Sequence, residues 1–129
     1  MILIDSSFAV EWLAGTARAA AVALPSVPLA ILPLQYAEVC AVFLRHHTEL
    51  TAIIRELDAI ELLHPDRVHL QQGAALYHRT RKKMRTTKIS LADAILAAVA
   101  LDHGARIATF DRDFLTLGFK GPMGIVSAV

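Results

Sequence analysis

The sequence predicts an α/β fold with a mainly parallel central sheet of about five strands flanked by helices. Short apolar runs alternate along the chain with longer segments in which apolar residues recur at helical spacing. The first run is continuously apolar, as expected for a parallel strand covered on both faces. No internal repeat, low-complexity segment or interdomain linker interrupts this alternation, so we expect residues 1–129 to form a single domain.

The strands are predicted where apolar runs are bounded by polar or turn-forming residues. Asp5 closes the first run, and His64 followed by Pro65 stops the third, because a residue before proline is biased away from helix. The expected strands are residues 1–5, 29–32, 60–63, 106–109 and 123–126.

The helices are predicted from their caps and their apolar spacing. Gly15 and Gly104 are expected to end two of them, and Pro33 suits the first turn of a third. Residues able to cap a helix start are Ser6 with Ser7, Thr48, Asp66 and Ser90. The first expected helix runs from residue 6 to about 13, and a second, alanine-rich helix follows Gly15 and runs to about 24. The others run from 33 to about 47, over 49–58, from 66 toward 84, and from 90 to 104.

Composition limits the class of protein. The chain is 55% hydrophobic with a net charge of +1, but prolines at 25, 28 and 33 interrupt its longest apolar region. The N-terminus also lacks a secretory pattern, so we expect a cytoplasmic protein with an apolar oligomer surface and no membrane segment. The single cysteine excludes an internal disulfide, and the six histidines show no zinc-ligand spacing in the sequence.

Four carboxylates that stand alone in apolar segments are the most informative residues: Asp5, Glu38, Asp93 and Asp111. Acids are rarely buried unless they are paired or bind a metal. The carboxyl ends of parallel strands meet at one edge of a sheet, where ligands bind. Asp5 and Asp111 each follow a predicted strand, so the pattern indicates a hydrolytic metal site at that edge.

Each acid also has an ordinary explanation. Asp5 could cap a helix, Asp93 could belong to a capping box, Asp111 could be a turn residue, and Glu38 could face solvent. Two carboxylates about 5 Å apart repel by roughly 3 kcal/mol at an effective dielectric of about 20. A cluster of four acids would therefore need either protonation or a bound cation. An all-oxygen ligand set favours Mg²⁺ or Mn²⁺ over zinc. Asp113 is a weaker candidate ligand.

These residues resemble the PIN-domain nucleases, and most closely the VapC-like ribonuclease toxins. The matching segments are residues 2–7, Glu38 with Arg45, residues 90–95 and residues 109–114. The resemblance implies a three-layer PIN-like fold with an acidic pocket at the carboxyl edge of the sheet. It implies Asp5, Glu38, Asp93 and Asp111 as catalytic ligands of Mg²⁺ or Mn²⁺, with Asp113 as an additional acid. It also implies that Ser7 and Thr109 orient the ligands, that the protein forms a homodimer, and that a short antitoxin silences it.

A basic stretch precedes the helix that carries Asp93. The chain has no acid between Asp66 and Asp93, and that interval contains the candidate RNA-binding residues Arg79, Arg81, Lys82, Lys83, Arg85 and Lys88. These cations could contact RNA phosphates without reading sequence, or could form an ordinary solvated helix end.

The sequence therefore predicts a metal-dependent endoribonuclease, the toxin of a toxin–antitoxin pair. Two other classes stay open. One is a noncatalytic RNA-binding or scaffold domain. The other is a phosphatase or phosphotransfer domain with Asp5 as the nucleophile, although Ser7 stands where haloacid-dehalogenase-like phosphatases would have a second aspartate.

Overall fold

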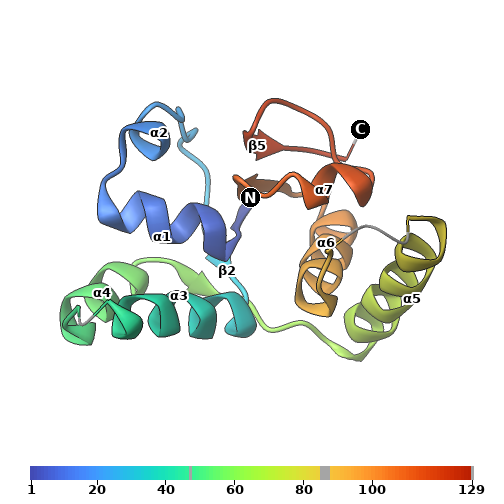
Figure 1. Cartoon of the computed structure of the whole chain (residues 1–129), viewed down its shortest axis with the longest axis horizontal. Helices are drawn as coiled ribbons and strands as arrows, with labels where there is room; N and C mark the ends of the chain where they lie inside the picture. The colour runs from blue at the N-terminus through green and yellow to red at the C-terminus, as the bar shows by residue number, and fades with distance from the viewer. Residues whose placement is uncertain (47, 85–87, 129) are drawn as a thin grey trace.

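A five-stranded sheet lies at the centre of the molecule (Figure 1). The computed structural model describes residues 1–46, 48–84 and 88–128, and within these the strand order is β3-β2-β1-β4-β5. The strands are β1 (Ile2–Ile4), β2 (Leu29–Ile31), β3 (Glu61–Leu62), β4 (Arg106–Thr109) and β5 (Gly124–Val126). All neighbours pair in parallel except β4 and β5, which pair antiparallel. The predicted mainly parallel sheet is confirmed.

Helices cover both faces of the sheet. They are α1 (Ser6–Ala14), α2 (Ala17–Ala20), α3 (Pro33–Arg45), α4 (Leu50–Leu57), α5 (Arg67–Lys83), α6 (Leu91–His103) and α7 (Asp113–Thr116). Along β1, Ile2 and Ile4 pack with Phe8 of α1 on one face, whereas Leu3 packs with Leu96 of α6 on the other. Figure 1 shows α1, α3 and α4 on one side of the sheet and α5, α6 and α7 on the other. The predicted three-layer arrangement is confirmed.

Several predicted caps are present. Asp66 accepts the His69 N–H at 2.9 Å at the start of α5, and Ser90 accepts the Asp93 N–H at 3.1 Å at the start of α6. Gly15 and Gly104 end α1 and α6 with φ angles of 72° and 58°, a left-handed conformation that glycine adopts without steric cost.

Three local predictions were wrong, and one helix was missed. Helix α2 ends at Ala20 rather than near residue 24, because the chain turns so that Val22 packs closely against Gly124 of β5. Thr48 does not cap α4, because the N-cap position belongs to Glu49, and the Thr48 N–H donates to the Phe43 carbonyl of α3. Neither Ser6 nor Ser7 is the N-cap of α1; that position belongs to Asp5. Helix α7 was not predicted.

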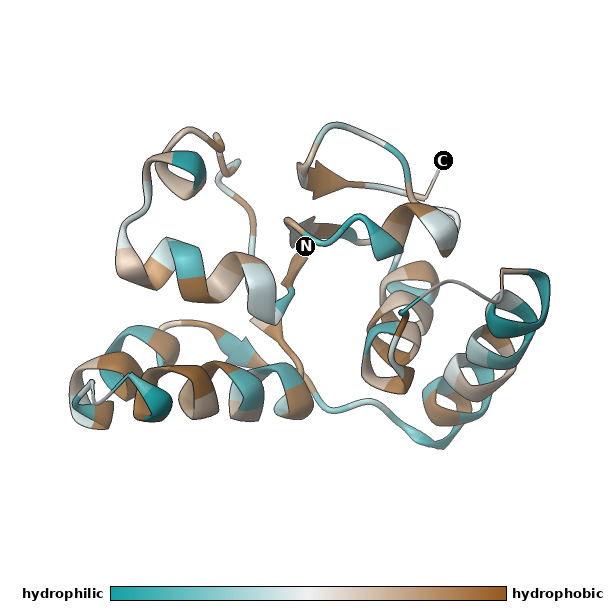
Figure 2. Ribbon diagram, viewed as in Figure 1, coloured by the Kyte–Doolittle hydropathy of each residue, from teal (hydrophilic) through white to brown (hydrophobic). Residues whose placement is uncertain are grey.

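Helix α6 is the most buried helix of the molecule, and α5 packs tightly along it. A β-carbon added to Gly73 of α5 would lie 2.8 Å from Ile95 Cα of α6, so only glycine permits this approach. In Figure 2, α6 is largely hydrophobic while the carboxyl end of α5 is strongly hydrophilic. Among the described residues, no helix combines the length and the apolar character needed to cross a bilayer.

Candidate metal centre

The sheet brings two of the predicted carboxylates to one edge. Asp5 directly follows β1, and Asp111 lies two residues beyond the end of β4. These two strands are parallel neighbours, and the Asp5 N–H donates to the Ala108 carbonyl at 3.0 Å, which extends their pairing to the site. The two acids therefore emerge from the same carboxyl edge, as the sequence predicted.

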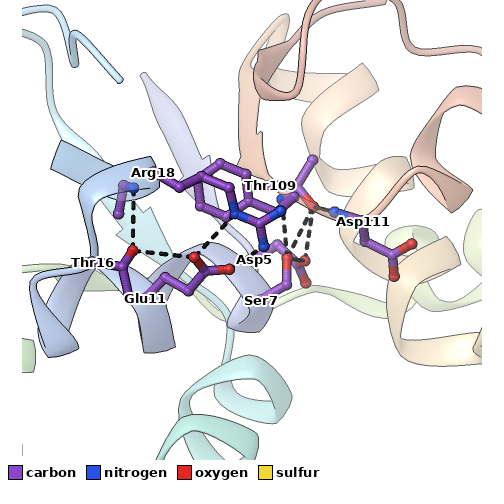
Figure 3. Close-up of polar contacts among 9 residues, drawn as sticks. Asp5, Ser7, Glu11, Thr16, Arg18, Thr109 and Asp111 are labelled. Atoms are coloured by element: carbon purple, nitrogen blue, oxygen red, sulfur yellow. Dashed lines mark hydrogen bonds and ion pairs between the residues drawn. The ribbon is translucent and has the colours of Figure 1, made fainter. Parts of the chain in front are cut away.

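Two hydroxyls fix the Asp5 carboxylate. Ser7 Oγ and Thr109 Oγ1 both donate to Asp5 Oδ2, at 2.7 and 2.9 Å (Figure 3). Each hydroxyl also accepts a backbone N–H from the segment after β4, Ser7 from Phe110 at 3.1 Å and Thr109 from Asp111 at 2.9 Å. Because each hydroxyl has one proton and gives it to Asp5, the 3.3 Å contact between the two hydroxyl oxygens is not a further hydrogen bond. This arrangement ties β1, α1 and the loop after β4 around one carboxylate.

The other two carboxylates come from helices on opposite sides of the sheet. Glu38 lies in α3, where its Oε2 accepts from Ser6 Oγ at 3.3 Å, and Asp93 lies in the first turn of α6. Gln35 joins these two helices, because its Nε2 donates to the Ala92 carbonyl at 3.3 Å. Gln35 is buried, and its Oε1 has no partner among the described residues.

The carboxylates influence one another electrostatically. Burial, followed by the charges of Asp5 and Asp111, raises the pKa of Asp93 from 3.8 to about 7, although hydrogen bonds with Ser90 oppose the change. Burial and then the charge of Asp5 also raise the pKa of Glu38. Burial raises the pKa of Asp5 itself, although its hydroxyl partners oppose the change. All four acids therefore belong to one coupled negative site.

The acids are less buried than the sequence suggested. Asp5 is 2% exposed, but Asp93 and Asp111 are half-buried and Glu38 is exposed. Their oxygens do not converge on a single point: in the described part of the chain, the one group of three potential ligands within 4.8 Å of one another lies elsewhere. The site is an open acidic pocket rather than a closed cage.

Asp113 lies at the rim of this site. Its N–H donates to Asp111 Oδ1 at 2.8 Å at the start of α7, which also fixes the orientation of Asp111. Burial and the charge of Asp111 raise the pKa of Asp113, while Lys88 lowers it. Lys88 is therefore close enough to act on the acidic site.

The remaining predicted cations form the end of α5. Arg79, Arg81, Lys82 and Lys83 are all exposed there. Arg79 and Lys83 line a pocket of about 260 Å³ whose opposite wall is the carboxyl end of α7 with Leu117 and Gly118. The structure thus places part of the basic stretch beside the helix that begins at Asp113. Arg85 lies outside the described residues.

Sequence reasoning missed several residues around the site. Besides Ser6 and Gln35, Arg18 of α2 forms an ion pair with Glu11, which also accepts from the Thr16 hydroxyl at 3.1 Å (Figure 3). The Arg18 guanidinium lies 4.1 Å from the centre of the Phe110 ring, between Thr109 and Asp111 in the sequence. No sequence pattern marks these contacts, because they join segments that are far apart in the chain.

Solved structures of known proteins share this fold. VapC20 of Mycobacterium tuberculosis, described as a sarcin-ricin loop cleaving toxin, has a TM-score of 0.74 at 21% identity, covering 95% of this chain and 99% of that chain. A toxin–antitoxin complex from Klebsiella pneumoniae contains a chain with a TM-score of 0.70 at 23% identity, covering 88% of this chain and 90% of that chain.

Sequence comparison gives the family. The chain is similar to Ribonuclease VapC11 of Mycobacterium tuberculosis and to VapC ribonuclease Mb1587 of Mycobacterium bovis. It is 30% identical to each over 122 residues, covering 88% of this chain and 89% of each relative. The PIN domain family matches residues 2–120, which include all the candidate site residues named above. The chain therefore belongs to the PIN domain family.

Proposed function

We propose that this protein is a divalent-metal-dependent endoribonuclease and the toxin of a toxin–antitoxin pair. The observation that carries the proposal is the Asp5 carboxylate, which two hydroxyls hold next to Asp93. Burial and then the neighbouring charges raise the pKa of Asp93 to about 7. The names of the relatives, which are VapC ribonucleases, support the choice of RNA as substrate. We take residues 1–129 as one nuclease domain, since both apolar clusters cover the same sheet, and we infer a cytoplasmic location from the RNA substrate.

The residues present fit a magnesium or manganese ion. The candidate ligands Asp5, Glu38, Asp93 and Asp111 offer only oxygen atoms, which these ions prefer. Their mutual repulsion is a free-energy cost that a divalent cation would remove. Mg²⁺ usually keeps several waters and uses few direct protein ligands, which suits carboxylates that do not converge on one point. When bound, such an ion would activate a water and stabilise the charge that develops on the phosphodiester.

The chain's own residues supply orientation. Ser7 and Thr109 hold Asp5 in one rotation, because both side-chain hydrogen bonds go to Oδ2. The same hydroxyls hold the backbone of residues 110 and 111, so Asp5 and Asp111 cannot move independently. We propose that this shared fixation keeps the ligands placed for in-line attack on the phosphate.

The carboxylates of the acidic pocket would repel the phosphates of RNA, so other residues must attract the substrate. We propose that Lys88 and the exposed cations Arg79, Arg81, Lys82 and Lys83, with Arg85 between them in the sequence, contact RNA phosphates. Lys88 acts on Asp113 at the rim, and Arg79 and Lys83 line the pocket beside α7. A strand of RNA that follows these cations would pass next to the acidic site.

We further propose a short antitoxin partner and a homodimer. An apolar pocket between the amino ends of α3, α5 and α6 is lined by Leu34 and Leu70, whose side chains are 55% and 46% exposed. Because both leucines line the same apolar pocket, they belong to one contiguous apolar patch, which is the feature that marks a protein interface. Light scattering should show a dimer for the native chain and a monomer for Leu34→Lys, and an unchanged mass would contradict this placement of the interface.

Incubation of the antitoxin-free protein with RNA tests the enzymatic proposal. We expect discrete fragments with Mg²⁺ or Mn²⁺, none with EDTA, and at least a hundredfold loss of cleavage for Asp5→Asn and Asp93→Asn. Asp58→Asn is the matched control, because Asp58 is an exposed aspartate at the end of α4. Full activity of Asp93→Asn would refute the assignment. RNA binding without cleavage in either metal would favour a noncatalytic domain instead.

A further inference from the structure

A second group of potential metal ligands lies outside the acidic pocket. His69 of α5 and the adjacent Asp102 and His103 of α6 each offer one ligand atom, and these atoms lie within 4.8 Å of one another. The two imidazole rings are 5.8 Å apart between centroids. The sequence concealed this group, because His69 is separated from the other two residues by more than thirty positions and no zinc-ligand spacing connects them.

The group differs in chemistry and placement from the carboxylate site. It joins the amino end of α5 to the carboxyl end of α6, whereas Asp93 lies at the amino end of α6. Two imidazole nitrogens and one carboxylate are a ligand set typical of zinc and related transition metals rather than of Mg²⁺. His69 is 6% exposed and fixed in place, while Asp102 and His103 are exposed and free to adjust.

The hydrogen bonds of His69 define its present state. Nδ1 accepts the Asp66 N–H at 3.0 Å, so the ring proton is on Nε2, which donates to Asp102 Oδ2 at 2.8 Å. Asp66 Oδ1 lies 3.2 Å from Nδ1. If the ring proton moves from Nε2 to Nδ1, Nε2 gains a free lone pair. The Nδ1–H group then donates to Asp66 Oδ1, and this bond replaces the one that Nδ1 now accepts from the Asp66 backbone N–H. A carboxylate that accepts from the second ring nitrogen is the usual support of a metal-binding histidine.

Charge also favours a cation here. Asp66 and Asp102 are both carboxylates, and within the described residues neither pairs with a lysine or an arginine. A divalent ion would offset the negative charge that these two acids bring together.

We propose that His69, Asp102 and His103 form a transition-metal site, selective for Zn²⁺ over Mg²⁺, that fastens α5 to α6. Tetrahedral ligands at the usual zinc distances lie roughly 3.3 Å apart. The 2.8 Å separation of His69 Nε2 from Asp102 Oδ2 must therefore widen by about half an ångström. The Asp102 side chain is 58% exposed and can make this movement, and water can occupy the fourth position.

Zn²⁺ titration of the metal-free, full-length protein tests the proposal. Melting temperatures and calorimetric stoichiometry should be measured for the native chain and for Asp102→Asn, His103→Gln and Asp93→Asn. His78→Gln is the matched control, because His78 is exposed on α5 and outside the group. His69 is left intact, since its substitution would also remove a cap of α5. We expect a rise of roughly 10 °C in the native chain at a Zn²⁺ concentration a hundred times the dissociation constant.

The proposal requires that this rise persist in Asp93→Asn and His78→Gln and fall by at least half in both Asp102→Asn and His103→Gln. Nitrogen NMR of the imidazole rings should show the His69 proton on Nε2 without metal and on Nδ1 with Zn²⁺. An equal rise in His103→Gln would place the ion elsewhere and overturn the proposal, as would the absence of any Zn²⁺ response. None of these measurements depends on RNA cleavage, so they stand apart from the nuclease assay.

Discussion

In the absence of metal, the negative charge of Asp93 in the acidic pocket should destabilise the folded protein. The carboxylate is half-buried beside Asp5 and Asp111, and ionising it costs free energy because burial and like charge both oppose the negative form. Asp93→Asn keeps the shape of the side chain, the Ser90 hydrogen bond to its backbone N–H and one oxygen that can accept from Ser90, and it removes the charge. We therefore expect this variant to be more stable than the native chain when no metal is present.

The magnitude follows from the pKa. A change from 3.8 in the unfolded chain to about 7 in the folded protein corresponds to about 4 kcal/mol, at about 1.4 kcal/mol for each tenfold in proton affinity. Asp93 is not fully enclosed, so screening by solvent reduces this by about half, to about 2 kcal/mol. For a chain of this size that difference raises the melting temperature by roughly 8 °C.

The pH dependence has a definite sign. A raised pKa means that the folded state holds a proton that the unfolded state has lost, so native stability falls as pH rises from 3.8 to about 7. The advantage of Asp93→Asn should therefore be about 2 kcal/mol at pH 8 and under about 1 kcal/mol at pH 5. Urea unfolding in EDTA at both pH values measures it, with Asp58→Asn as the control.

Metal should reverse the order of stabilities. At a Mg²⁺ concentration a hundred times the dissociation constant, the native chain gains about 2.7 kcal/mol, and the variant, lacking a ligand, gains much less. If Asp93→Asn is no more stable than the native chain at pH 8 in EDTA, the charge of Asp93 does not destabilise the folded protein and the reasoning is refuted. A Mg²⁺ response equal in both proteins would remove Asp93 from the ligand set.

Three further predictions concern individual contacts. Thr109→Val removes a donor to Asp5 and should lower kcat ten- to a hundredfold in an RNA cleavage assay at saturating metal; an unchanged kcat would mean that Ser7 alone suffices. Gly73→Ala places a β-carbon 2.8 Å from Ile95 Cα and should destabilise the protein by about 1 kcal/mol in urea, because overpacking exceeds the gain in helix propensity; a stabilised variant would contradict the close packing. Lys88→Gln should raise KM at constant kcat, with a smaller effect at high salt, and a fall in kcat alone would argue against phosphate binding.

The sheet and the edge on which the acids gather could be predicted from the sequence because both depend on local patterns. Buried strands appear as apolar runs, and a carboxylate at the end of such a run marks the edge where parallel strands finish. Asp5 and Asp111 were found in this way. The hydroxyls of Ser7 and Thr109 came only through the resemblance to a family, since nothing local distinguishes them from helix caps or strand residues.

The remainder depends on tertiary contacts that no local pattern encodes. The residue pattern alone made Ser7 a candidate helix cap, yet its hydroxyl donates to Asp5, which itself occupies the cap position. Glu38 stands in an apolar segment of the sequence, yet its side chain is exposed at the open site because Val39 takes the buried position on that helix. Helix α7 is a single turn whose start depends on the side chain of Asp111, and so short an element carries no periodicity.

Helix α6 explains how the fold tolerates a costly acidic site. Residues 94–100 of this helix are buried along its whole middle, and Gly73 lets α5 approach it closely, so packing holds the helix whatever the charge at its amino end. The repulsion at Asp93 therefore cannot be relieved by moving the helix; it is relieved by protonation or by a cation. In the nuclease that we propose, a site built on so rigid an element would keep its carboxylates in place before metal and RNA bind, as positional catalysis of phosphodiester cleavage requires.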